Sequence, residues 1–148
     1  MIEKTFPITE KLLATGLKST QKLFELLNAE SEQLKQNTDP AALSTLAANK
    51  KEVVAQLEQF SKQLAQVLAT EKLLVSQEGI MSYLAKAKAT GITIAQSLQY
   101  WLDIAELSKQ CRSLNEQNGA SIDLLSRHVS QHPHSFINTA ISASRWCS

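Results

Sequence analysis

Apolar residues recur at alternating steps of three and four along most of the chain, a spacing that places them on one face of a helix. The stripe nearest the C-terminus constrains the fold most. It consists of Ile104, Leu107, Cys111, Leu114, Asn118, Ile122, Leu125 and Val129. The dipeptide Asn118-Gly119 is typical of tight turns, yet it lies inside this stripe. Because the helical period continues on both sides, we predict a helix that runs through Gly119, although glycine costs about 1 kcal/mol relative to alanine in a helix interior.

Composition agrees with an all-α fold. The 148 residues suffice for one ordinary domain with a buried core. Four glycines, three prolines and few aromatic residues favour long helices, and runs that alternate with period two are missing. Fifteen Lys plus Arg against fourteen Asp plus Glu leave a formal net charge of +1. Such a balance creates no overall field toward nucleic acid or an anionic membrane, so we expect partners chosen by shape and apolar contact.

Two further stripes predict a long antiparallel helical hairpin. The first helix is expected to open after Pro7, with Thr9 as its N-cap, and to run to about Gln36. Asp39-Pro40 then supplies an N-cap and a first helical residue, and the second helix should continue to about Val75. At about 1.5 Å per residue these helices are roughly 45 to 50 Å long, so the molecule should be elongated.

A charged residue interrupts the second stripe at Lys50. Glu30 lies as far before Pro40 as Lys50 lies after it, so an antiparallel hairpin should bring the two side chains level. A charge in an apolar seam needs a partner, and we predict that Glu30 and Lys50 form a structural pair. The alternative is that both side chains reach solvent and contribute roughly 0 to 1 kcal/mol.

Beyond the hairpin the pattern loosens and then resumes. Gly79 and Gly91 bracket residues 80–90, which we expect to form a short connector helix. Thr93-Ile94-Ala95-Gln96 has the spacing of a capping box and predicts the start of the third long helix, which should end near His132-Pro133. The fold class is therefore an elongated antiparallel bundle of three long helices with a short connector helix.

A tail follows Pro133. It still holds four large apolar residues, namely Phe136, Ile137, Ile141 and Trp146. An apolar tail of this kind either docks back as a further helix or waits for a partner. We therefore divide the chain into a helical domain, 1–133, and a C-terminal tail, 134–148.

No catalytic constellation emerges, so we expect neither an enzyme nor a cofactor. The sequence has no Gly-rich phosphate loop, HExxH helix or Gly-x-Ser-x-Gly elbow. His128, His132 and His134 cluster, and with Cys147 they could hold a metal, but exposed imidazoles at a frayed helix end are the simpler reading, and we expect no metal. Two alternative functions stay open: histidine phosphotransfer through His128, although no Lys-Gly follows it, and a coiled-coil assembly subunit.

Cysteines and hydropathy favour a cytoplasmic protein. There is no CxxC spacing, and Cys111 is expected to pack as a small apolar residue. The N-terminus lacks a basic region followed by an apolar run, and no segment approaches the roughly 20 apolar residues of a membrane helix. We expect no membrane insertion, no nucleic acid and no small-molecule substrate.

Three blocks in order resemble the FlgN family of flagellar type III export chaperones. They are Asn28-Ala29-Glu30-Ser31-Glu32-Gln33-Leu34, then Lys50-Lys51-Glu52-Val53-Val54, then Trp101 followed by Leu114-Asn115-Glu116-Gln117-Asn118-Gly119. The resemblance implies a cytosolic helical chaperone that binds the C-terminal segments of hook-associated proteins, which join hook to filament. It also implies that the chaperone prevents their premature assembly and delivers them to the cytoplasmic domain of the export gate.

Two sets of residues are candidates for partner binding. On the third helix they are Asn115, Asn118, Gly119, Ile122 and Leu125, and in the tail they are Phe136, Ile137, Ile141 and Trp146. Asn and Gly in a helical seam let a second helix approach closely and hydrogen-bond in register. The same property also suits a purely structural role, in which Asn118 sets the register of helices within the monomer and Gly119 permits close packing of the first helix against the third.

Overall fold

The computed structural model describes residues 1–36 and 39–129, of which 123–129 are described as helix backbone only. Four helices account for nearly all of them: α1 (Ile2–Lys35), α2 (Pro40–Ala69), α3 (Gln77–Ala89) and α4 (Ala95–Val129). No strand occurs within these ranges, which confirms the all-α prediction. The tail, 134–148, and its four candidate residues lie outside the described residues.

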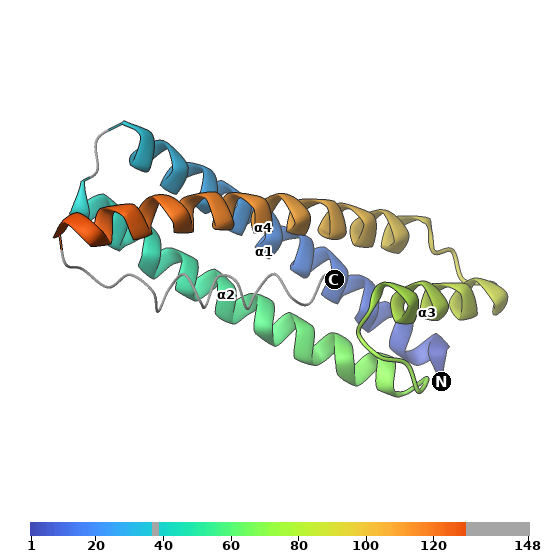
Figure 1. Cartoon of the computed structure of the whole chain (residues 1–148). Coiled ribbons are helices and arrows are strands. Elements are labelled where there is room, and N and C mark those ends of the chain that lie inside the picture. The colour runs from blue at the N-terminus through green and yellow to red at the C-terminus, as the bar shows by residue number, and fades with distance from the viewer. Residues whose placement is uncertain (37–38, 130–148) are drawn as a thin grey trace.

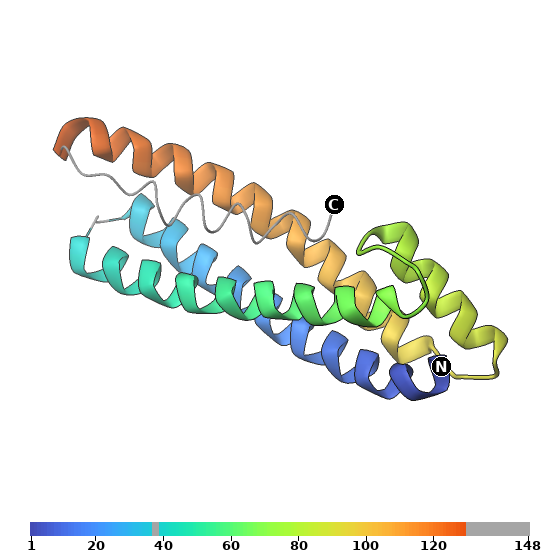
Figure 2. The same cartoon turned by 90° about the horizontal axis from the view of Figure 1, so that it is seen from below.

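The three long helices form an elongated bundle (Figure 1). The α2 helix runs antiparallel to α1, and α4 starts at the end of the bundle where α2 finishes, so it runs in the same direction as α1 (Figure 1). The most extensive packing joins α1 to α4 and α1 to α2, so both of the other long helices pack against α1. Both views place α3 at the end of the bundle that holds the N-terminus (Figure 2).

The start of α1 differs from the sequence prediction. The helix begins at Ile2 and contains Pro7, which was expected to precede it. A proline inside a helix costs about 3 kcal/mol through a lost hydrogen bond and a clash. That cost is offset because Ile2 and Phe6 are both buried in the core. Thr9 is not an N-cap, since its hydroxyl donates to the Thr5 carbonyl at 3.1 Å.

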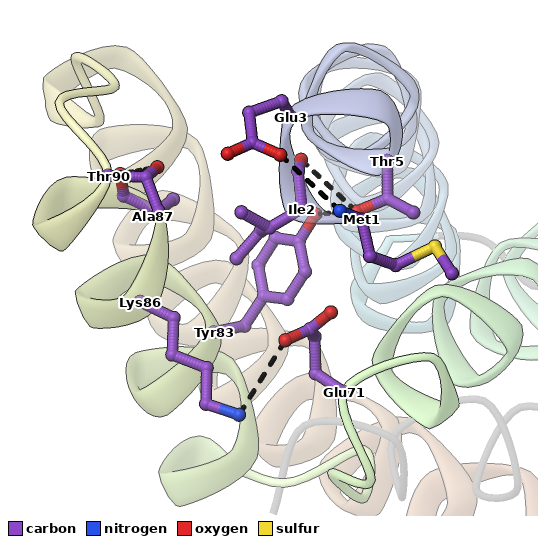
Figure 3. Close-up of polar contacts among 9 residues, drawn as sticks. All are labelled: Met1, Ile2, Glu3, Thr5, Glu71, Tyr83, Lys86, Ala87 and Thr90. Atoms are coloured by element: carbon purple, nitrogen blue, oxygen red, sulfur yellow. Dashed lines mark hydrogen bonds and ion pairs between the residues drawn. The ribbon is translucent and has the colours of Figure 1, made fainter.

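Polar contacts join the first turns of α1 to α3 (Figure 3). The Thr5 hydroxyl lies 2.6 Å from the buried Tyr83 hydroxyl, and Thr9 donates to the same oxygen at 3.1 Å. At the chain end, Glu3 accepts a hydrogen bond from the terminal ammonium at 3.3 Å. The backbone N–H of Glu3, together with this ammonium, lowers the pKa of the Glu3 carboxyl. Because α1 is helical from Ile2 onward, Thr5 and Thr9 lie four residues apart on the same face, and both reach Tyr83 of α3.

The α2 helix ends at Ala69, earlier than the predicted Val75. Its end is a Schellman motif, in which Leu73 N–H donates to the Leu68 carbonyl at 3.0 Å and Lys72 N–H to that of Ala69 at 3.0 Å. Lys72 adopts the left-handed conformation, with φ of 59°. Glycine is the usual residue at this position, so a lysine there hides the stop signal from the sequence.

Glycine positions fix both ends of α3. The helix begins at Gln77, after Ser76, whose hydroxyl accepts from Gly79 N–H at 3.0 Å. Gly79 therefore lies within the first turn and does not precede the helix, and a Cβ there would overlap the Leu74 carbonyl oxygen. Gly91, with φ of 92°, terminates α3 in the same motif that ends α2.

The α4 helix begins at Ala95, and the capping box predicted at Thr93 is not its start. Leu98 N–H donates to the Ile94 carbonyl at 2.8 Å, so Ile94 accepts the first helical hydrogen bond. From there α4 continues to Val129 without a break at Gly119. The helical period at Asn118-Gly119 therefore outweighs the turn tendency of the dipeptide, as the sequence predicted.

The core divides into two clusters along the bundle. The proximal cluster, at the α3 end, contains Ile2, Phe6, Leu13, Phe60, Leu64, Val67, Leu68, Ile80, Tyr83, Leu84, Ala87, Trp101 and Ile104. The distal cluster, toward the α1–α2 turn, contains Leu23, Leu26, Leu27, Val53, Val54, Leu57 and Cys111. All helices contribute to the first cluster, whereas the second is built almost entirely from the α1–α2 hairpin.

Candidate functional site

A buried ion pair joins α1 to α2 near the end of the hairpin. Lys50 Nζ lies 3.1 Å from Glu30 Oε1 and 3.0 Å from Oε2, and the two side chains are 2% and 1% exposed. Glu30 and Lys50 therefore lie opposite each other in the hairpin, as their equal distance from Pro40 in the sequence predicted. Neither charge reaches solvent, contrary to the alternative of two exposed side chains.

Asn118 on α4 completes this arrangement. Its Nδ2 donates to Glu30 Oε1 at 3.0 Å and to the Leu27 carbonyl at 2.9 Å, and the residue is 2% exposed. We call Glu30, Lys50 and Asn118 the polar node. Three helices meet at it, and each supplies one side chain. The sequence marked the pair and the asparagine separately, but no feature of the sequence linked them.

The link depends on the register between α1 and α4. Cys111 Sγ lies 4.0 Å from the Thr20 carbonyl, and Asn118 reaches the Leu27 carbonyl one heptad further along both helices. When two parallel helices pack along a heptad repeat, a contact between one pair of residues is repeated seven residues further along both helices. A heptad comparison of residues 20–30 with residues 111–121 could therefore have suggested the contact, but only once the two helices were known to be neighbours.

Three of the other candidate residues of α4 lie on the same inward face. Asn115 and Ile122 are 3% and 5% exposed, and Gly119 is buried. The side chain of Leu125 lies outside the described residues. In this arrangement the inward face of α4 packs within the bundle, which is the structural role that the sequence left open for Asn118 and Gly119.

A family model described as FlgN protein matches residues 5–142, nearly the whole chain. The chain belongs to the FlgN family. No curated protein and no solved structure matches it. Membership gives the general role of a flagellar export chaperone and confirms the resemblance found in the sequence. The matched range includes the whole polar node and part of the tail.

In this FlgN-family chain the polar node joins the helices to one another and is not accessible to a substrate. The Glu30 carboxylate accepts hydrogen bonds from Lys50 and Asn118 and is 1% exposed, so a substrate cannot reach it. Among residues 1–36 and 39–122, no group of three His, Cys, Asp or Glu side chains could hold a metal ion. The side chain of His128, together with His132, His134 and Cys147, lies outside the described residues. No helix in the described part is long and apolar enough to cross a membrane.

Proposed function

We propose that this FlgN-family chain is a cytoplasmic chaperone for hook-associated proteins. It binds the C-terminal segments of these client proteins, prevents their premature assembly and delivers them to the cytoplasmic domain of the flagellar export gate. The match to the FlgN family over residues 5–142 is the observation that supports this proposal.

The helical architecture suits such a client. Subunits of a filament junction carry helix-forming apolar segments that aggregate or polymerise when uncovered, and a bundle of long helices can cover them by the helix-in-groove mode. The chaperone must also release its client, so we expect moderate affinity. Co-purification with hook-associated proteins, with and without their C-terminal segments, tests the proposal. Retention of clients that lack these segments would contradict it.

The client surface is proposed to combine the tail with the C-terminal part of α4. The tail residues are Phe136, Ile137, Ile141 and Trp146, and the α4 residues are Asn115, Asn118, Gly119, Ile122 and Leu125. Because Asn118 and Ile122 are buried against the bundle, contact through α4 requires this part of the helix to separate from α1. Deletion of residues 134–148 should weaken client binding, and unchanged affinity would reject a role for the tail.

A further inference from the structure

We infer that the outer face of α1 is a basic strip that holds the protein on the surface of an anionic membrane, reversibly and without insertion. The strip consists of Lys4, Ile8, Lys11, Thr15, Lys18 and Lys22. We call it the lysine strip. The inference goes beyond the proposed function and does not depend on it, because the lysine strip is separate from the α4 and tail residues assigned to the client.

The residues of the lysine strip share one face of α1. They follow one another at alternating steps of four and three, the spacing that keeps residues of a helix in line. All of them are exposed, whereas buried residues of the same part of α1, such as Leu13 and Gly16, belong to the opposite face. From Lys4 to Lys22 the helix rises about 27 Å, so the lysine strip is a long row on one side of the bundle.

Acidic side chains are nearly absent from this part of α1. Between Lys4 and Lys22 the sequence has one carboxylate, that of Glu10. Glu10 is half-buried and accepts a hydrogen bond from the Ser97 hydroxyl of α4 at 3.2 Å, so its charge lies at the α1–α4 interface. Among the described residues, none of the four lysines forms an ion pair. The lysine strip therefore presents four unpaired positive charges, although the whole chain carries a formal charge of +1.

The neighbouring flank of α2 is uncharged. The Ser19 hydroxyl donates to Gln56 Oε1 at 3.3 Å, which places this flank beside α1. Gln59, Gln63 and Gln66 follow Gln56 at steps of three and four, and all four glutamines are exposed. Amide side chains neither neutralise the lysines nor repel an anion. The positive charge of the lysine strip thus stays undiminished on the α2 side.

These features suit a charged surface better than a binding pocket. The lysine strip lies on the convex side of a single helix, and flexible lysine side chains act as separate point charges, unlike the planar fork of arginine that binds one carboxylate through two hydrogen bonds. Near an anionic lipid surface, each lysine increases partitioning about fivefold. A long row on one helix lets the four lysines approach such a surface together.

Ile8 adds an apolar contact within the lysine strip. It is 55% exposed, and Lys4 and Lys11 are its neighbours on the same face. At a membrane interface the stems of lysine lie against apolar material while the ammonium groups stay in water, and an isoleucine between them can enter the headgroup region. Because the contact is shallow and largely electrostatic, binding should be weak and sensitive to salt. The net charge of the chain concealed this property because the basic residues are segregated on one face.

Flotation with lipid vesicles tests the inference. One set of vesicles contains one part phosphatidylglycerol to two parts phosphatidylcholine, and the other contains phosphatidylcholine alone. At about 0.01 M salt, where the Debye length is about 30 Å, the protein should float with the anionic vesicles and stay behind with the neutral ones. At about 1 M salt, where the Debye length is about 3 Å, it should be released. No flotation with anionic vesicles at low salt, or equal flotation with both sets, overturns the inference.

A pair of double variants locates the binding surface. Lys11→Gln/Lys18→Gln should lower the partition coefficient on anionic vesicles about tenfold, since it removes two lysines from the middle of the strip. Lys88→Gln/Lys109→Gln removes the same charge from exposed positions of α3 and α4, and it should lower the coefficient less than about twofold. Glutamine and lysine have similar helix propensities, so both variants should fold, and circular dichroism checks this. Equal losses in the two variants would show that net charge governs binding, and the lysine strip would be rejected.

Soluble poly-L-glutamate distinguishes a membrane from an acidic protein segment. If the lysine strip binds lipid, the polymer should compete weakly with anionic vesicles at low salt. If wild type binds the polymer, loses that binding in Lys11→Gln/Lys18→Gln and does not float with anionic vesicles, the strip binds an acidic polypeptide and the inference is wrong. Neither result bears on client binding, so the proposed function is tested separately by co-purification.

Discussion

Replacement of Lys50 by methionine should destabilise the protein by about 3 kcal/mol, the lower end of the range for breaking one partner of a buried ion pair. Methionine fills much of the same volume as lysine, so the loss of stability comes from removal of the ammonium group and not from a cavity. Glu30, 1% exposed, would keep its hydrogen bond from Asn118 at 3.0 Å but lose both bonds from the ammonium. An uncompensated carboxylate would then remain buried among three helices.

Urea denaturation followed by circular dichroism measures this loss. The midpoint should fall with the slope unchanged, because the surface exposed on unfolding stays the same. In a thermal scan the same loss corresponds to a decrease of roughly 6 to 12 °C for a chain of this size. Lys51→Met is the matched control, since Lys51 is the exposed neighbour, and it should change stability by less than about 0.5 kcal/mol.

The double variant Glu30→Gln/Lys50→Met separates charge from packing. It removes both charges, and the amide oxygen of the introduced glutamine remains as an acceptor for Asn118, so the stability should return to within about 1 kcal/mol of wild type. If Lys50→Met alone costs less than about 1 kcal/mol, the pair is not energetically coupled and the argument for the polar node is wrong.

Four further variants test local features by the same denaturation assay. Lys72→Gly should stabilise the protein by about 1 kcal/mol, since glycine tolerates φ of 59°. Gly91→Ala should destabilise it by about as much, because alanine disfavours φ of 92°. A loss of stability in Lys72→Gly together with a gain in Gly91→Ala would contradict the left-handed conformation of these residues. Gly79→Ala should cost more than about 2 kcal/mol, because the new Cβ meets the rigid Leu74 carbonyl, and a neutral result would refute that close approach. Tyr83→Phe should cost about 1 to 2 kcal/mol by leaving two buried threonine hydroxyls without their shared partner; an unchanged midpoint would show that these hydrogen bonds contribute nothing.

Helix boundaries show where local sequence rules were sufficient. Asp39 caps α2 as predicted, with its carboxylate accepting from Ala41 N–H at 3.0 Å, because an N-cap requires only residues next to each other in the chain. The prediction that α1 begins after Pro7 was wrong because the cost of a proline inside a helix is offset by the burial of Ile2 and Phe6 against residues far away in the sequence. Lys72 was missed because a left-handed lysine has no sequence signature.

The candidate site shows the same division. The distance from the turn was enough to place Glu30 beside Lys50, since a hairpin with a short turn sets its own register. Asn118 was recognised as a polar residue in a helical seam, but its acceptors on α1 could not be identified. The connection between α2 and α4 runs through α3 and two loops, and the register of α4 against α1 depends on how that connection packs.

The sequence alone therefore determined that this chain is an all-α protein with three long helices, that it belongs to the FlgN family, and that α1 and α2 form a hairpin that brings Glu30 level with Lys50. These properties depend on periodicity, caps and short turns, which are local. Only the tertiary structure decided the register in which α4 lies against α1, the position of Asn118 beside Glu30 and Lys50 in the node, and the makeup of the distal apolar cluster, which belongs almost entirely to α1 and α2. Those properties depend on contacts between residues some ninety positions apart, and such contacts are selected by the packing of the whole bundle.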